Sequence, residues 1–137
     1  MKLSACYIVK NEEKNLPHSI QSVCSAADEL IVVDTGSKDR TKTLAVQYGA
    51  AVYDYNWADD FSAPRNYAIS LATGDWIVFL DADESFVYPE RVRRAIESLV
   101  DQQTEKDAVM LRRRELDLDD GGKEIGREWC LRIFQNR

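Results

Sequence analysis

The chain has 137 residues, 45% of them hydrophobic, and its 24 acidic and 18 basic side chains give a formal net charge of −6. We expect residues 1–137 to form a single domain with a hydrophobic core, and the acidic balance argues against nucleic acid as the main partner. No apolar stretch is long enough to span a bilayer. Three widely spaced cysteines without a CxxC or Cys/His cluster argue against zinc and a disulfide framework, and favour a reducing cytosol.

Strand-like apolar runs alternate with helix-like segments along the chain. The apolar runs predict strands at residues 3–9, 29–33, 51–55, 76–80, 108–118 and 128–134. The capping residues, prolines and glycines predict helices over 17–27, from Ser37 or Asp39 to Tyr48, from Ser62 to just before Gly74, and from Pro89 onward. Asp119–Gly122 reads as the turn of a hairpin between the last two strands.

This alternation predicts an α/β fold, a doubly wound and mostly parallel sheet with helices on both faces, in three layers α/β/α. Right-handed crossovers place the carboxyl ends of the first, second and fourth strands along one edge of the sheet. The segments Asn11–Glu12, Asp34–Ser37 and Asp81–Asp83 directly follow those strands. We therefore expect them to converge where ligands of such folds bind.

The run Trp76–Leu80 is apolar and ends abruptly in Asp81, Asp83 and Glu84. Hard carboxylate oxygens at a strand end suit Mg²⁺ or Mn²⁺, with the phosphate oxygens of a ligand completing the coordination. Adjacent acids repel one another unless a cation or basic side chains neutralise them. The alternative is a solvated strand end without a metal.

Two further features suggest nucleotide binding. Asp34 can accept hydrogen bonds from a base or a ribose, and Gly36 lets the backbone turn close to a ligand; the alternative is an ordinary capped turn. Arg65 lies early in a helix, where a positive charge is unfavourable, which suggests a diphosphate or carboxylate partner. A surface ion pair with Asp59 or Asp60 is the alternative.

Four segments together resemble the family 2 glycosyltransferases, inverting enzymes with the Rossmann-like GT-A fold. The segments are Tyr7–Glu13, Ile31–Thr41, Arg65-Asn66 and Gly74–Glu84. The final segment, Trp129–Arg137, is similar to one found in a bacterial branch of that family. The resemblance implies that the chain is the N-terminal, donor-binding part of such an enzyme.

The resemblance also implies roles for individual residues. The metal, Mg²⁺ or Mn²⁺, would be held by Asp83 and Asp81 of a DxD motif and bridge the phosphates of a nucleotide-sugar donor, with UDP favoured. The implied donor-binding residues are Val9, Asn11, Glu12, Asp34, Gly36, Ser37, Arg65, Asp81, Ala82 and Asp83. The acceptor would be a glycan, lipid-linked or protein acceptor of cell-wall or polysaccharide biosynthesis, with the enzyme in the cytoplasm or peripheral at the inner face of the membrane.

An inverting transferase also needs a general base, which in this family lies well downstream of the DxD motif. No acid after Asp83 lies in a motif that matches the family's general base. We therefore expect the base beyond Arg137 and a C-terminally truncated domain. Two other functions stay open. One is a haloacid-dehalogenase-type phosphatase using Asp81 and Asp83, and the other is a non-catalytic nucleotide-binding module.

Overall fold

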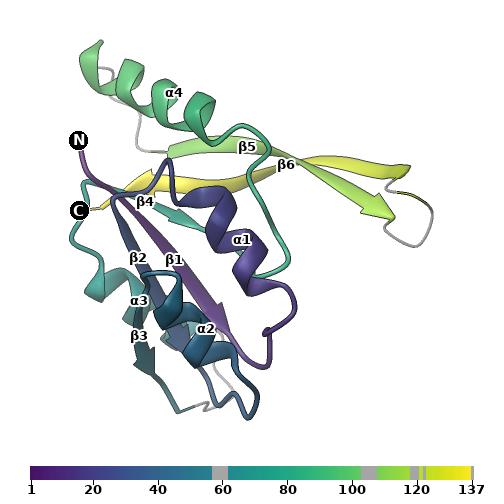
Figure 1. The fold of residues 1–137 in the computed structure, drawn as a ribbon. Helices are drawn as coiled ribbons and strands as arrows, with labels where there is room; N and C mark the ends of the chain where they lie inside the picture. The colour runs from purple at the N-terminus through teal and green to yellow at the C-terminus, as the bar shows by residue number, and fades with distance from the viewer. Residues whose placement is uncertain (57–61, 103–107, 118–120, 122, 137) are drawn as a thin grey trace.

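The computed structural model describes residues 1–56, 62–102, 108–117, 121 and 123–136. Six strands form one sheet in the order β3-β2-β1-β4-β6-β5 (Figure 1). The elements are β1 (Leu3–Val9), α1 (Leu16–Val23), β2 (Glu29–Asp34), α2 (Thr41–Gln47), β3 (Ala51–Asp54), α3 (Ser62–Leu71), β4 (Trp76–Phe79), α4 (Pro89–Asp101), β5 (Ala108–Asp117) and β6 (Lys123–Gln135).

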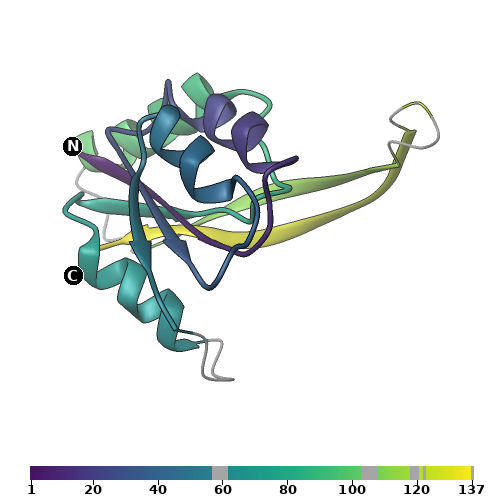
Figure 2. The same ribbon diagram turned by 60° about the horizontal axis from the view of Figure 1, so that its bottom comes forward.

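The sheet separates two apolar layers. Strands β1 to β4 are mutually parallel, whereas β6 runs antiparallel to β4 and β5 antiparallel to β6. Leu16 of α1, Ala45 of α2 and Ile96 of α4 pack into the core on one face. Ala68 of α3 packs into the core on the other face (Figures 1 and 2). The predicted three-layer, mostly parallel α/β fold is therefore confirmed.

The last two strands form a long hairpin that projects from the rest of the domain (Figure 2). β6 starts at Lys123, not at Glu128 as the sequence suggested, because it pairs with β5 along the whole hairpin. Only its final part continues the sheet, where Ile133 to Gln135 pair with β4. The predicted turn at Asp119–Gly122 falls largely outside the described residues, apart from Gly121.

Two helix boundaries differ from the predictions. α1 ends at Val23, not at Ala27. The helical spacing of Cys24 with Ile20 and Val23 predicts that it packs against the sheet as core filler, but Cys24 is exposed. α2 begins at Thr41 without a side-chain cap from Ser37, whose hydroxyl accepts a hydrogen bond from Asn11 N instead. Asp39 supports the start of this helix by accepting from Thr41 N.

Within the part of the chain that the structure describes, no helix has the length and apolar character required to traverse a lipid bilayer.

Candidate functional site

Three loops meet at the carboxyl edge of the parallel strands. Val9 is in register with Asp34 on the neighbouring strand, and β1 lies between β2 and β4. β2 and β4 are thus two strand spacings, about 10 Å, apart across the sheet, and β4 ends at Phe79, which is in register with Cys6 of β1. The topology therefore places the Asp34 turn and the Asp81–Asp83 turn on one edge of the sheet.

Asp34 is the least satisfied buried acid at this edge. Its side chain is only 2% exposed, and its Oδ1 accepts hydrogen bonds from Gly36 N (2.9 Å) and Ser37 N (2.8 Å). Gly36 has φ +116°, a backbone conformation that a residue with a side chain adopts only under strain. Asp34 Oδ2 is buried and has no hydrogen-bond partner among the described residues. A buried acceptor of this kind is costly unless a ligand or water satisfies it.

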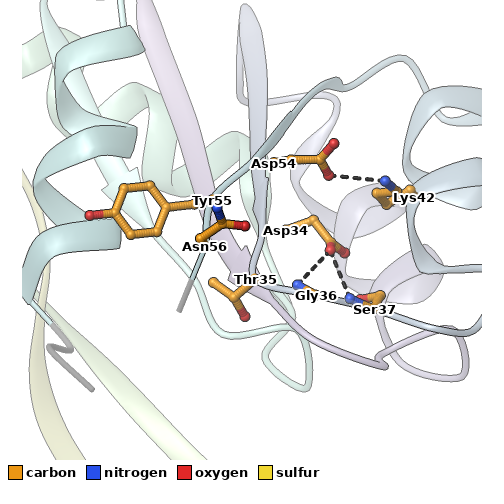
Figure 3. Close-up of a pocket in the computed structure, with 8 residues that line it drawn as sticks. All are labelled: Asp34, Thr35, Gly36, Ser37, Lys42, Asp54, Tyr55 and Asn56. Carbon is orange, nitrogen blue, oxygen red and sulfur yellow. Dashed lines mark hydrogen bonds and ion pairs between the residues drawn. The ribbon is translucent and has the colours of Figure 1, made fainter. Parts of the chain in front are cut away.

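Asp34 opens onto a cavity of about 390 Å³, within the size range of small-molecule sites (Figure 3). Eight residues from β2, α2, β3 and the loops that follow β2 and β3 line it: Asp34, Thr35, Gly36, Ser37, Lys42, Asp54, Tyr55 and Asn56. Besides Asp34, the cavity includes Gly36 and Ser37 from the predicted donor-binding set.

Sequence reasoning missed half of this cavity. Lys42 and Asp54 form an ion pair (Nζ to Oδ1, 3.0 Å) at the cavity wall. The hydrogen bond from Lys42 to Asp54, reinforced by the charge of Asp54, raises the pKa of Lys42. Asp54 is in register with Asp34 on the neighbouring parallel strand. The rule that drew attention to Asp34, an acid at the end of a parallel strand, would also have found Asp54.

The loop after β1 is tied to the loop after β2 by its own polar groups. Ser37 Oγ accepts from Asn11 N, and Asn11 Oδ1 accepts from Lys38 N, both at 2.8 Å. Glu12 N donates to Thr41 Oγ1 at the same distance. Asn11 adopts φ +54°, which its short polar side chain tolerates. Asn11, Glu12 and Ser37 therefore shape the edge of the site, and their contact with a donor stays a prediction.

The side chain of Val9 is buried in the core, and its carbonyl oxygen accepts hydrogen bonds from Thr35 N (2.9 Å) and Thr35 Oγ1 (3.1 Å). Ala82 is buried in the same core. Both side chains are buried, and contact of either residue's backbone with a donor stays a prediction.

The three acids of the turn after β4 differ in their exposure to solvent. The side chain of Asp81 is 68% exposed, Asp83 is also exposed, and Glu84 is 14% exposed. Arg132 of β6 lies among them, with Nη2 3.0 Å from Glu84 Oε2 and 3.6 Å from Asp81 Oδ2. A basic side chain thus neutralises part of the negative charge of Asp81 and Glu84. This is one of the two ways, a basic side chain or a cation, in which we expected the repulsion among these acids to be relieved.

The donor set at this turn fits Mg²⁺ or Mn²⁺. Asp81 and Asp83 present hard oxygen atoms toward solvent, and Mg²⁺ in proteins commonly uses one or two carboxylates with ligand phosphates and water. Among the described residues, no three His, Cys, Asp or Glu side chains gather into a complete protein-only metal site. The arrangement therefore suits a cation bound together with a phosphate ligand.

Arg65 of α3 stacks on the last strand residue before this turn. Its Cζ lies 4.5 Å from the centroid of the Phe79 ring, a cation–π contact. The alternative partners Asp59 and Asp60 lie outside the described residues. Arg65 is thus held beside the end of β4, at the same edge as the acidic turn.

Residues 4–133 match the sequence model of "Glycosyl transferase family 2". A TPR repeat-containing protein of Synechococcus elongatus is 54% identical over 86 residues, which cover 63% of this chain and 21% of that protein. An uncharacterized glycosyltransferase of Rickettsia felis is 42% identical over 83 residues, covering 61% of this chain and 29% of the relative. The chain thus spans less than a third of the length of either relative.

Solved structures share the fold. The Staphylococcus aureus TarS fragment 1–349 superposes with a TM-score of 0.65 at 24% identity, over 75% of this chain and 33% of that one. Glucosyl-3-phosphoglycerate synthase of Mycobacterium tuberculosis with UDP bound gives 0.60 at 26% identity, over 72% and 40%. The same enzyme with Mn²⁺, UDP and glucosyl-3-phosphoglycerate gives 0.53 at 27%, over 59% and 33%. The architecture is therefore that of the GT-A glycosyltransferases.

Proposed function

Because the chain belongs to glycosyl transferase family 2, we propose that its sheet edge binds a nucleotide-sugar donor, a UDP-sugar, for transfer to an acceptor. The observation that carries the proposal is Asp34 Oδ2, a buried acceptor without a partner among the described residues, at a cavity of suitable size. Family membership favours transfer over the phosphatase alternative for the acids after β4. The remaining alternative is a module that binds the nucleotide without transferring a sugar.

The geometry of Asp34 favours uracil over guanine. Gly36 and Ser37 amides already occupy Oδ1, so one carboxylate oxygen remains for a ligand. Uracil offers a single imide N–H between two carbonyl groups, which matches one acceptor. Guanine offers two adjacent donors, an N–H and an amino group, which are spaced to pair with the two oxygens of one carboxylate, and Oδ1 of Asp34 is already occupied. Leaving a buried donor unpaired costs about 1–3 kcal/mol, which is sufficient to discriminate between the bases.

The diphosphate would then extend along the edge toward the acidic turn. Asp83 and Asp81 would hold Mg²⁺ or Mn²⁺, with Asp83 the principal ligand, and the cation would stabilise the negative charge of the departing nucleoside diphosphate. Arg65, fixed against Phe79, supplies a positive charge at the same place. The synthase from M. tuberculosis, solved with Mn²⁺ and UDP, supports this use of a divalent cation. We propose sugar transfer to an acceptor, with the help of a general base, for the whole enzyme. Donor binding is what we propose for the residues described above.

Calorimetric titration with UDP, GDP and CDP, each with and without Mn²⁺, tests the donor site. We expect UDP to bind more tightly than the other two nucleotides, and Mn²⁺ to strengthen UDP binding. Equal affinity for all three nucleotides would contradict the assignment of Asp34, and UDP binding indifferent to Mn²⁺ would contradict the assignment of Asp83. Transfer itself is tested by UDP-sugar turnover with candidate acceptors, where donor binding without turnover would favour the non-catalytic module.

A further inference from the structure

Arg132 is a basic residue that does not line the cavity and has no role in the proposed donor site. It lies 48 positions after Glu84 in the chain, and the pairing of β6 with β4 brings the two together. Arg132 and Glu84 side chains are 20% and 14% exposed, so their 3.0 Å ion pair is largely shielded from water. Arg132 Nε is buried without a hydrogen-bond partner among the described residues. The acids Glu84 and Asp81 therefore provide the stabilisation that keeps this guanidinium in place.

Glu84 connects Arg132 to the backbone of the acidic turn. While Oε2 accepts from Arg132, Oε1 accepts from Asp81 N at 2.8 Å. Glu84 N in turn donates to Asp81 O at 2.9 Å. The carboxylate of Glu84 is thus a brace between β6 and the first residue of the Asp81-Ala82-Asp83 segment.

Resting on the proposed donor site, we propose that Arg132 is a positioning residue for the divalent cation. By binding Glu84, Arg132 fixes the turn before any cation arrives. It also withdraws Glu84 from the carboxylates that could compete for the cation, which leaves the exposed Asp83 as the principal ligand. Since Glu84 offsets its charge, the guanidinium repels a bound cation much less than a lone arginine would.

Two measurements on Arg132→Gln test this role. The first is Mn²⁺-dependent UDP affinity, which we expect to fall about 10- to 100-fold, as for other residues that orient metal ligands, while UDP binding without metal is unchanged. The second is hydrogen exchange of the Asp81 amide by NMR in the absence of any ligand, which we expect to accelerate, because its acceptor Glu84 is no longer held. Arg132→Lys, which keeps the charge but loses the planar fork, should recover part of both.

Arg127→Gln is the matched control. Arg127 lies on the same strand and pairs with Glu124, a residue of the projecting hairpin. This variant should leave both the Mn²⁺-dependent affinity and Asp81 amide exchange as in the parent. Glu84→Gln should reproduce the faster exchange of Arg132→Gln, since it weakens the same brace from the other side.

The outcomes separate this role from the proposed function. Parent-like Asp81 exchange in Arg132→Gln would overturn the positioning role, and so would faster exchange spread equally over the β1 amides, which would indicate general loss of stability. If the parent itself shows no Mn²⁺-dependent UDP binding, the donor-site proposal fails and with it the role toward the cation. Parent-like Mn²⁺-dependent affinity in Arg132→Gln would refute that role while leaving the donor site intact.

Discussion

The two edges of the parallel sheet treat their acidic residues in opposite ways. At the amino edge, where the strands begin, Asp28 Oδ2 accepts from Leu3 N and from Arg93. Glu29 accepts from Ser4 Oγ and from Thr73. These acids find all their donors within the protein, and the pKa of both carboxyl groups is lowered. For Asp28 the main cause is the hydrogen bond from Leu3 N, and for Glu29 hydrogen bonds from Ser4 and Thr73 outweigh its partial burial.

At the carboxyl edge the acids are left with capacity to bind something else. Asp34 keeps one buried oxygen without a hydrogen bond, and Asp83 is exposed and makes no hydrogen bond or ion pair with another described residue. Other acids at this edge are held by the protein: Glu84 by Arg132 and Asp81 N, and Asp39 by Glu13 N and Thr41 N. The comparison suggests that acids at the amino edge stabilise the fold, whereas Asp34 and Asp83 at the carboxyl edge are available to a ligand.

The largest effect should come from Asp83→Asn. Replacing the exposed carboxylate removes a charged oxygen ligand, so we expect the Mn²⁺-dependent gain in UDP affinity to disappear. This loss should exceed the roughly 10- to 100-fold that is typical of residues that only orient a metal ligand. Calorimetry with and without Mn²⁺ measures it. Because Asp83 has no partner among the described residues, thermal unfolding should be unchanged. A lowered melting temperature would show that Asp83 stabilises the fold as the acids at the amino edge do, contrary to this prediction.

Asp34→Asn should reduce UDP affinity by about 10- to 100-fold, the equivalent of a hydrogen bond to a charged group. The amides of Gly36 and Ser37 require an oxygen at one position, so the new amino group must face the cavity. That amino group can donate to the ring nitrogen of cytosine, which accepts where uracil donates. We therefore expect the preference to shift from UDP toward CDP in a direct titration.

Asp54→Asn is the control for this shift, because Asp54 lines the same cavity but is occupied by Lys42. It should leave the order of UDP over CDP as in the parent. A parent-like preference in Asp34→Asn would show that another group reads the base.

Local pattern was sufficient for the fold and for the acids that follow strands. The apolar run Trp76–Leu80 and the residues after it identified a buried strand and its acidic turn, because burial on both faces leaves a continuous apolar signature. Asp34 was found in the same way. The pattern could not predict which of these acids are buried and which are exposed, because the burial of Asp34 and the exposure of Asp81 depend on the strands that lie beside each.

Long-range pairing accounts for most of what was missed. Arg132 reaches Glu84 only because β6 pairs antiparallel with β4, and nothing within either segment specifies that partner. Cys24 is exposed, and α1 ends at Val23, four residues before the predicted Ala27, at a boundary that no glycine or proline marks. Helix ends and strand partners are set by tertiary packing, which residue spacing reports only indirectly.

The smallest effect, and the one that tests the amino edge, is that of Asp28→Ala. Losing the acceptor for Leu3 N and Arg93 should lower the free energy of unfolding by about 1 kcal/mol while leaving UDP affinity as in the parent. Since the folded-state pKa of Asp28 is lowered, its contribution is complete above the unfolded-state value of about 3.9 and is lost as pH falls through the folded-state value. Urea unfolding between pH 7 and pH 2 should therefore show a gap between parent and variant that closes below about pH 4. Asp83→Ala, measured alongside, should show no gap at any pH. A gap of similar size for Asp83 would mean that the two edges do not divide stability and binding between them.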